Sequence, residues 1–168
     1  MKKLEKMLES KVKIRFQDCD PFNHLNNSKY IDYIINTRED QLLENYNFDI
    51  YKLAFEEGLS WVVAQNQIAY FNPAMLMETV TIQTQLIFYD NKTLVAEALM
   101  WDEDKTKLKT VLWIKLVHYN LKTNQSNLHS EELMILFEQI LIPQTNLLSF
   151  DERVKNLKEL YFFNKINI

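Results

Sequence analysis

Three successive segments in the second half of the chain read as β-strands separated by short polar turns. They are residues 78–89, 92–101 and 109–119. The first alternates with a period of two, and one of its faces carries Val80, Ile82, Leu86 and Phe88. Such alternation is typical of a half-buried strand, and short turns join strands that run antiparallel. The second half of the chain is therefore limited to an antiparallel sheet.

Two further strands and one long helix precede this sheet in the sequence. Residues 11–17 alternate, with Val12, Ile14 and Phe16 on one face, and residues 61–71 form a strand that ends before Pro73. Residues 28–46 contain neither Gly nor Pro. Their apolar side chains recur at helical spacing, at Ile31, Ile34, Ile35, Leu42 and Leu43. This pattern predicts one helix of roughly 18 residues, about 27 Å long at 1.5 Å per residue.

Two more helices are predicted near the C-terminus. Ser130 is a plausible N-cap followed by two acidic residues, and Pro143 ends that region. Residues 149–152 match a capping box, which starts a short last helix that reaches about residue 162.

These elements predict an α+β fold in which a five-stranded antiparallel sheet packs on one long helix, with extra C-terminal helices. We expect one domain over residues 1–168, with a core of about 11–140 and a C-terminal helical extension over 141–168. The segment 109–119 is apolar on both faces, as in a strand that is covered on both sides. One face would pack on the long helix, and the other on a different layer such as a second subunit.

Composition excludes several classes of protein. The net charge of −4 comes without any cluster of Lys or Arg, which argues against nucleic-acid binding. No apolar run approaches the roughly 20 residues of a membrane helix, and the N-terminus lacks the apolar core of a signal peptide. Cys19 is the single cysteine, so neither an internal disulfide nor a cysteine-based zinc site is expected. The expected location is the cytoplasm.

The stretch DCDPFNHLNN, residues 18–27, holds more polar side chains than a turn requires. A structural interpretation is that Asp18 and Asp20 shape a turn, and that an Asn or Ser caps the following helix. A chemical interpretation is also open. A carboxylate just ahead of a helix N-terminus is favoured in its charged form, and the free backbone N–H groups there can stabilise an oxyanion. Attack on an activated acyl group needs both parts.

Residues 15–38 resemble the entry loop and central helix of hotdog-fold thioesterases. The likeness is strongest to the 4-hydroxybenzoyl-CoA thioesterase and acyl-CoA thioester hydrolase branch, with acyl-carrier-protein thioesterases as relatives. The matching residues are Phe16, Asp18, Asp20, His24, Leu25, Asn26, Asn27 and Tyr30. The resemblance implies a single hotdog fold and hydrolysis of acyl thioesters without a metal or a cofactor.

The resemblance also implies roles for individual residues. Asp20 matches the catalytic carboxylate, which acts as nucleophile or as general base. Asn27 matches the position whose backbone N–H polarises the thioester carbonyl, and His24 matches a histidine that orients or assists in the carrier-protein branch. Tyr30 and Arg38 are interpreted as structural, and we expect Arg38 to pair with an acid or to cap carbonyl groups.

Two departures from the family pattern bear on this assignment. Asn23 stands where Gly is common, and Asn is the non-glycine residue best suited to a positive φ. Phe22 stands where plant carrier-protein thioesterases place a catalytic Asn, which weakens that assignment. Cys19 is expected to be a small buried side chain with no lowered pKa.

The main hypothesis is an acyl-CoA thioesterase that forms a homodimer, with the two sheets joined edge to edge, or a homotetramer. Two alternatives stay open: an acyl-carrier-protein thioesterase, and a hotdog domain that binds an acyl thioester without catalysis. The intact Asp20 at the start of the predicted helix argues against the second alternative.

Overall fold

The computed structural model describes residues 4–143 and 149–166. Its main element is an antiparallel sheet with the strand order β1-β3-β4-β5-β2. The strands are β1 (Met7–Lys13), β2 (Leu59–Tyr70), β3 (Thr79–Tyr89), β4 (Thr93–Asp102) and β5 (Leu108–Asn120), and a short β6 (Gln125–Ser126) pairs with β5. Five strands are present as predicted, although β1 lies four residues closer to the N-terminus than the predicted segment 11–17. Strands β1 and β2 form the two edges of the sheet.

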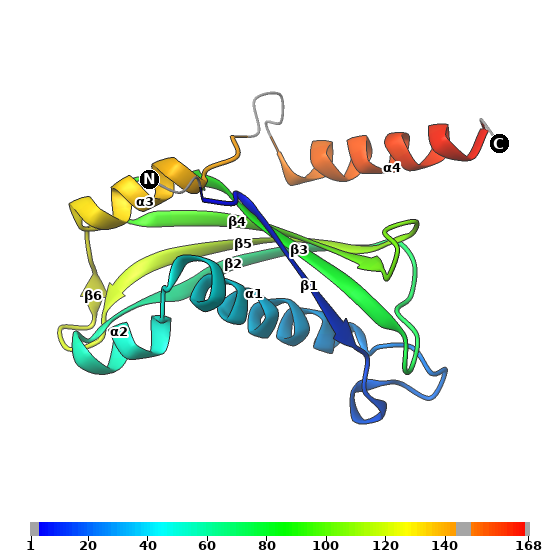
Figure 1. Cartoon of the computed structure of the whole chain (residues 1–168), viewed down its shortest axis with the longest axis horizontal. Helices are drawn as coiled ribbons and strands as arrows, with labels where there is room; N and C mark the ends of the chain where they lie inside the picture. Colours follow the sequence, from blue (N-terminus) through cyan, green and yellow to red (C-terminus); the bar gives the residue numbers. More distant parts are fainter. Residues whose placement is uncertain (1–3, 144–148, 167–168) are drawn as a thin grey trace.

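Helix α1 (Tyr30–Tyr46) lies against the inner face of the curled sheet, as Figure 1 shows. The core between them contains Ile34 of the helix, Ile82 and Met100 of the central strands, and Leu112 and Ile114 of β5, all almost completely buried. The predicted long helix is therefore confirmed, and it positions the loop that precedes it.

The buried stripe of α1 differs from the predicted apolar one. It consists of Tyr30, Ile34, Thr37 and Gln41, whereas Leu43 is 47% exposed. Gln41 is completely buried. Its amide tolerates this burial because it donates hydrogen bonds to the carbonyl of Ile82 and the hydroxyl of Ser10. Satisfied polar groups can replace apolar ones in a core, and apolar spacing alone does not reveal this.

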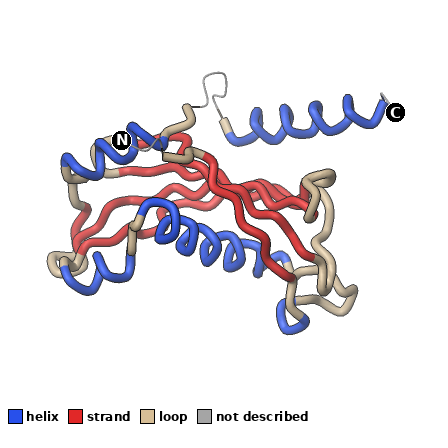
Figure 2. The backbone as a smooth tube through the Cα atoms, in the orientation of Figure 1, coloured by secondary structure: helices blue, strands red, loops and turns tan. Residues whose placement is uncertain are grey.

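Helix α4 (Phe150–Ile166) covers part of the outer face of the sheet, on the side opposite α1 (Figure 2). Phe150 and Leu157 pack there with Leu99, Leu108 and Val111. The expectation that β5 is covered on both faces is confirmed. Part of the second cover is this C-terminal helix, however, and not a second subunit.

Two side chains do not point the way that the sequence pattern predicts. Phe16 was expected inside with Ile14, but β1 ends at Lys13 and Phe16 starts a 3₁₀ turn (Phe16–Asp18), where it is 78% exposed. Phe88 was expected to face inwards with Leu86. A β-bulge between these two residues places Phe88 on the outer face, and it is 50% exposed. A bulge adds one residue to one strand and thereby reverses the facing of every later side chain.

The remaining helices lie at one end of the sheet. Helix α2 (Ile50–Glu56) was not predicted, although Asp49 caps its N-terminus and Gly58, with a φ of 74°, follows its end. Helix α3 (Glu131–Ile140) begins as predicted after Ser130, whose hydroxyl accepts a hydrogen bond from the backbone N–H of Leu133. At the start of α4 (Phe150–Ile166) the N–H of Glu152 donates to the hydroxyl of Ser149, as expected for the predicted N-cap, and the helix runs beyond its predicted end near residue 162. No helix within the described residues is both long enough and apolar enough to span a membrane.

Candidate active site

The loop between β1 and α1 is fixed to the helix through Asp18. The hydroxyl of Tyr33, on α1, donates a hydrogen bond of 2.8 Å to Oδ2 of Asp18 and accepts one of 3.0 Å from the backbone N–H of Arg15. Burial raises the pKa of Tyr33, and the neighbouring Asp18 carboxylate raises it further, so the hydroxyl keeps its proton. Asp18 therefore holds the loop in place, in agreement with the structural interpretation of this residue.

The carboxylate of Asp20 is oriented by two backbone N–H groups of its own loop. Its Oδ1 accepts hydrogen bonds from Phe22 N at 2.9 Å and from His24 N at 3.1 Å. The side chain is half-buried, and within the described residues no donor is recorded for Oδ2. One oxygen of Asp20 is thus held in place while the other is available to a substrate or a water molecule.

The turn that shapes this loop is made by Asn23. Its φ is 61°, the positive value that the sequence led us to expect for an Asn at a glycine position. Its N–H donates to the carbonyl of Asp20, and its carbonyl accepts from the N–H of Leu76. The N–H of Leu25 donates to the carbonyl of Ala74. The loop is therefore docked on the segment that leads into β3.

His24 contributes its backbone to the loop, since its carbonyl accepts a hydrogen bond of 2.8 Å from the N–H of Asp20. The half-buried imidazole lies 6.4 Å from the ring of Phe22, measured between centroids. In the part of the chain that the structure describes, no hydrogen bond joins this imidazole to Asp20. Its predicted orienting role stays a prediction.

Asn27 lies in a 3₁₀ turn (Asn27–Lys29) that runs directly into α1. The preceding Asn26 caps this turn, because its side-chain oxygen accepts from the N–H and the hydroxyl of Ser28. The carbonyl of Asn27 accepts a hydrogen bond from the hydroxyl of Tyr70, and no acceptor among the described residues is recorded for its N–H. A free N–H at the start of a helix, near the positive end of the helix dipole, suits an oxyanion.

Three other residues singled out in the sequence have structural surroundings. The hydroxyl of Tyr30 accepts a hydrogen bond from the N–H of Ala74 in the core, which supports its structural interpretation. Cys19 is half-buried rather than buried. Burial raises the pKa of its thiol, with smaller contributions from Asp18 and Asp20, so it is not a thiolate. Among the described residues, Arg38 meets neither the acid nor the carbonyl group that was expected, and its guanidinium donates to the hydroxyl of Thr84 instead.

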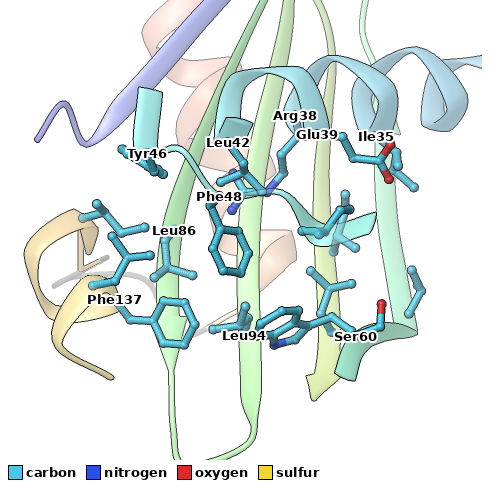
Figure 3. Close-up of a pocket in the computed structure, with 17 residues that line it drawn as sticks. Ile35, Arg38, Glu39, Leu42, Tyr46, Phe48, Ser60, Leu86, Leu94 and Phe137 are labelled. Atoms are coloured by element: carbon cyan, nitrogen blue, oxygen red, sulfur yellow. The ribbon is translucent and has the colours of Figure 1, made fainter. Parts of the chain in front are cut away.

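The sequence did not reveal an apolar pocket at the other end of α1. Figure 3 shows it between the C-terminal half of α1, the strands and α3. Its lining includes Leu42 and Phe48 near the end of α1, Trp61 at the start of β2, and Phe137 of α3. Helical spacing gave Leu42, but the contributions from β2 and α3 depend on tertiary packing.

Comparison with known proteins gives a consistent result. The thioesterase-like superfamily matches residues 14–143, well over half of the chain. The long-chain acyl-CoA thioesterase FadM of Escherichia coli (strain K12) is 25% identical over 134 residues, which cover 80% of this chain and 99% of that protein.

Two solved structures are similar as well. YbaW, a probable thioesterase from Escherichia coli, superimposes with a TM-score of 0.68 at 26% identity and covers 79% of this chain and 98% of that chain. A Staphylococcus aureus protein solved in complex with CoA has a TM-score of 0.73 at 13% identity, covers 82% of this chain and 85% of that chain, and shares the fold. The predicted hotdog fold, with its antiparallel sheet curled around one long helix, is confirmed. The chain therefore belongs to the thioesterase-like superfamily.

Proposed function

We propose that this protein hydrolyses acyl-CoA thioesters and that Asp20 carries the reaction. The single observation on which this depends is the Asp20 carboxylate, with one oxygen held by two backbone N–H groups and the other available. Membership of the thioesterase-like superfamily and the similarity to FadM, a long-chain acyl-CoA thioesterase, support the choice of substrate.

In the general-base form of the reaction, Oδ2 of Asp20 takes a proton from a water molecule whose oxygen attacks the thioester carbonyl. In the nucleophilic form, Oδ2 itself attacks, and water then hydrolyses the mixed anhydride. Either way the carbonyl oxygen becomes an oxyanion, to which the N–H of Asn27 can donate. Collapse of this intermediate breaks the carbon–sulfur bond, and the CoA thiolate leaves and takes up a proton. In the general-base form the same step gives the carboxylic acid. In the nucleophilic form the acid is released when water hydrolyses the anhydride, which restores the Asp20 carboxylate.

The acyl chain needs an apolar site, and the pocket at the far end of α1 offers one. Within one chain the Asp20 loop and the apolar pocket lie near opposite ends of β2. Tyr70, the last residue of β2, contacts Asn27, and Trp61 near its start lines the pocket. An antiparallel pair of β2 strands around a two-fold axis would bring the loop of one subunit to the pocket of the other.

The edge of β2 is suited to such pairing. It is 12 residues long, and Val62 and Val63 are 38% and 47% exposed. A long edge strand with exposed apolar side chains tends to pair with another chain. We therefore infer a homodimer joined through β2, which could assemble further into a homotetramer.

The test measures hydrolysis of acyl-CoA thioesters by the Asp20→Asn variant, with the release of free thiol as the readout. Asn keeps the size and can still accept both backbone hydrogen bonds, so the loop should persist, but it cannot act as a base. We expect turnover to fall by about 10²- to 10⁴-fold. Asp18→Asn is the matched control, because its carboxylate accepts from Tyr33 and has no proposed part in the chemistry. It should lose far less activity.

Other outcomes would change the assignment. Full activity in Asp20→Asn together with loss in Asp18→Asn would move the reacting carboxylate to Asp18. Faster hydrolysis of an acyl group carried by acyl-carrier protein than of the same acyl group on CoA would favour the carrier-protein alternative. The cytoplasmic location predicted from the sequence stays a prediction, which cell fractionation would test.

A further inference from the structure

Arg38 has an unusual environment for an arginine. It projects from α1 towards the sheet, among the residues that line the apolar pocket (Figure 3). Its guanidinium donates one hydrogen bond, of 3.2 Å, to the neutral hydroxyl of Thr84. Burial lowers the pKa of Arg38 to about 10, so the side chain is still charged at neutral pH.

Two other cations with little exposed surface are paired with carboxylates. Arg153, with 17% of its side chain exposed, makes a two-bond contact with Glu97. Lys109, with 6% of its side chain exposed, lies 2.7 Å from Glu78. Within the described residues Arg38 has no such partner. Its environment therefore lacks the carboxylate that the other two cations have.

Neighbouring polar groups do not supply that partner. The carboxylate of Glu39 also lines the pocket, but it accepts a hydrogen bond of 2.5 Å from the hydroxyl of Tyr51, and Figure 3 shows it turned away from the Arg38 nitrogens. The hydroxyl of Tyr46 donates to the carbonyl of Glu5. A partly buried cation without a counter-charge destabilises a fold, so its retention beside a cavity favours a compensating ligand.

The cavity beside Arg38 has room for such a ligand. Its volume is about 150 Å³, comparable to a cavity that accommodates benzene. The walls around it are largely apolar and include Leu42, Leu86 and Phe137. Methylene groups can pack against these side chains, and the planar guanidinium matches a carboxylate through two parallel hydrogen bonds.

We propose that Arg38 binds a carboxylate at the end of the acyl group remote from the thioester, so that ω-carboxyacyl-CoA thioesters are preferred substrates. The recognition of a carboxylate in this pocket follows from Arg38 and the cavity. The statement about substrates rests in addition on the proposed hydrolysis at Asp20. A free fatty acid presents the same chemistry if its carboxylate enters the pocket first. The experiment separates a free fatty acid from an ω-carboxyacyl-CoA.

The first arm measures binding alone, by calorimetry, with hexanoate against methyl hexanoate. A hydrogen bond to a charged group contributes about 1.5–3 kcal/mol, so hexanoate should bind about 10- to 100-fold more tightly. Arg38→Met, which has a similar length and no charge, should lose this preference. Arg38→Lys is the matched control and should keep part of it, because it retains the charge without the planar fork. Equal binding of acid and ester to the unmodified protein would overturn the proposal.

The second arm compares adipoyl-CoA with hexanoyl-CoA, and longer pairs of equal carbon number, by kcat/KM. We expect a preference for the ω-carboxyl member of at least about tenfold at the best length, reversed in Arg38→Met. Preference for hexanoate in binding without preference for any ω-carboxyacyl-CoA would refute the substrate assignment and indicate a free fatty-acid site. If no thioester is hydrolysed but hexanoate binding depends on Arg38, the proposed hydrolysis fails and the carboxylate site stands.

Discussion

The contact between Glu97 and Arg153 ties α4 to the outer face of the sheet. The side chain of Glu97 has no exposed surface, and its oxygens accept from Nε and Nη2 of Arg153 at 2.8 and 2.7 Å. Trp113 Nε1 and Gln85 Nε2 also donate to it, at 2.7 and 2.9 Å. We predict that Arg153→Met strongly destabilises the protein, because it leaves this carboxylate buried without its cation.

The size of the effect follows from the burial of both partners. Removal of one member of a buried ion pair costs about 3–5 kcal/mol. A chain of this length shifts its melting temperature by about 2–4 °C per kcal/mol, so Tm should fall by about 6–20 °C. Glu97→Gln combined with Arg153→Met should recover much of this loss, since a neutral Gln can still accept from Trp113.

Urea unfolding followed by circular dichroism measures the free energy of unfolding of the four proteins in this double-mutant cycle. Calorimetry gives the matching Tm values. A loss below about 1 kcal/mol in Arg153→Met would show that the pair behaves as an exposed one, whose typical value is about 0–1 kcal/mol. A double variant no more stable than Arg153→Met would refute the argument that the unpaired carboxylate is the cause.

Three further predictions concern pH, assembly and catalysis. Burial lowers the pKa of His118 and of His129 in the folded protein. Below about pH 6.5 the unfolded chain therefore binds more protons than the folded one. Unfolding scans should show the free energy of unfolding falling as the pH drops from about 7 to 5. His118 stacks on Trp61, and its Nε2 has no hydrogen-bond partner among the residues that the structure describes. His118→Phe should therefore reduce this dependence, and an unchanged slope would contradict the prediction. Light scattering should give a dimer or a tetramer, and a monomer at micromolar concentration would refute pairing through β2. His24→Ala should lower turnover by about ten- to a hundredfold, and unchanged turnover in a folded variant would make His24 structural.

Local patterns in the sequence were sufficient to predict the five long strands, the helices α1, α3 and α4, and the turn at Asn23, although not α2. The period of two marked the strands, the spacing of Ile31, Ile34 and Ile35 marked α1, and Ser130 marked the start of α3. The positive φ at Asn23 was predicted because it depends on the conformational preference of that one residue. Properties of this kind are determined within a few residues, so the amino-acid order alone reveals them.

Properties that join distant segments were decided by the tertiary structure. Glu97 and Arg153 are 56 positions apart, and nothing in either neighbourhood indicates the other. The bulge that turns Phe88 outwards depends on how β3 pairs with β4. The sequence led us to expect that Arg38 pairs with an acid or caps carbonyl groups, and its place in an apolar pocket becomes visible only once β2 and α3 enclose it. Register, bulges and the packing of separate layers determine these contacts, and periodicity along one segment carries no information about them.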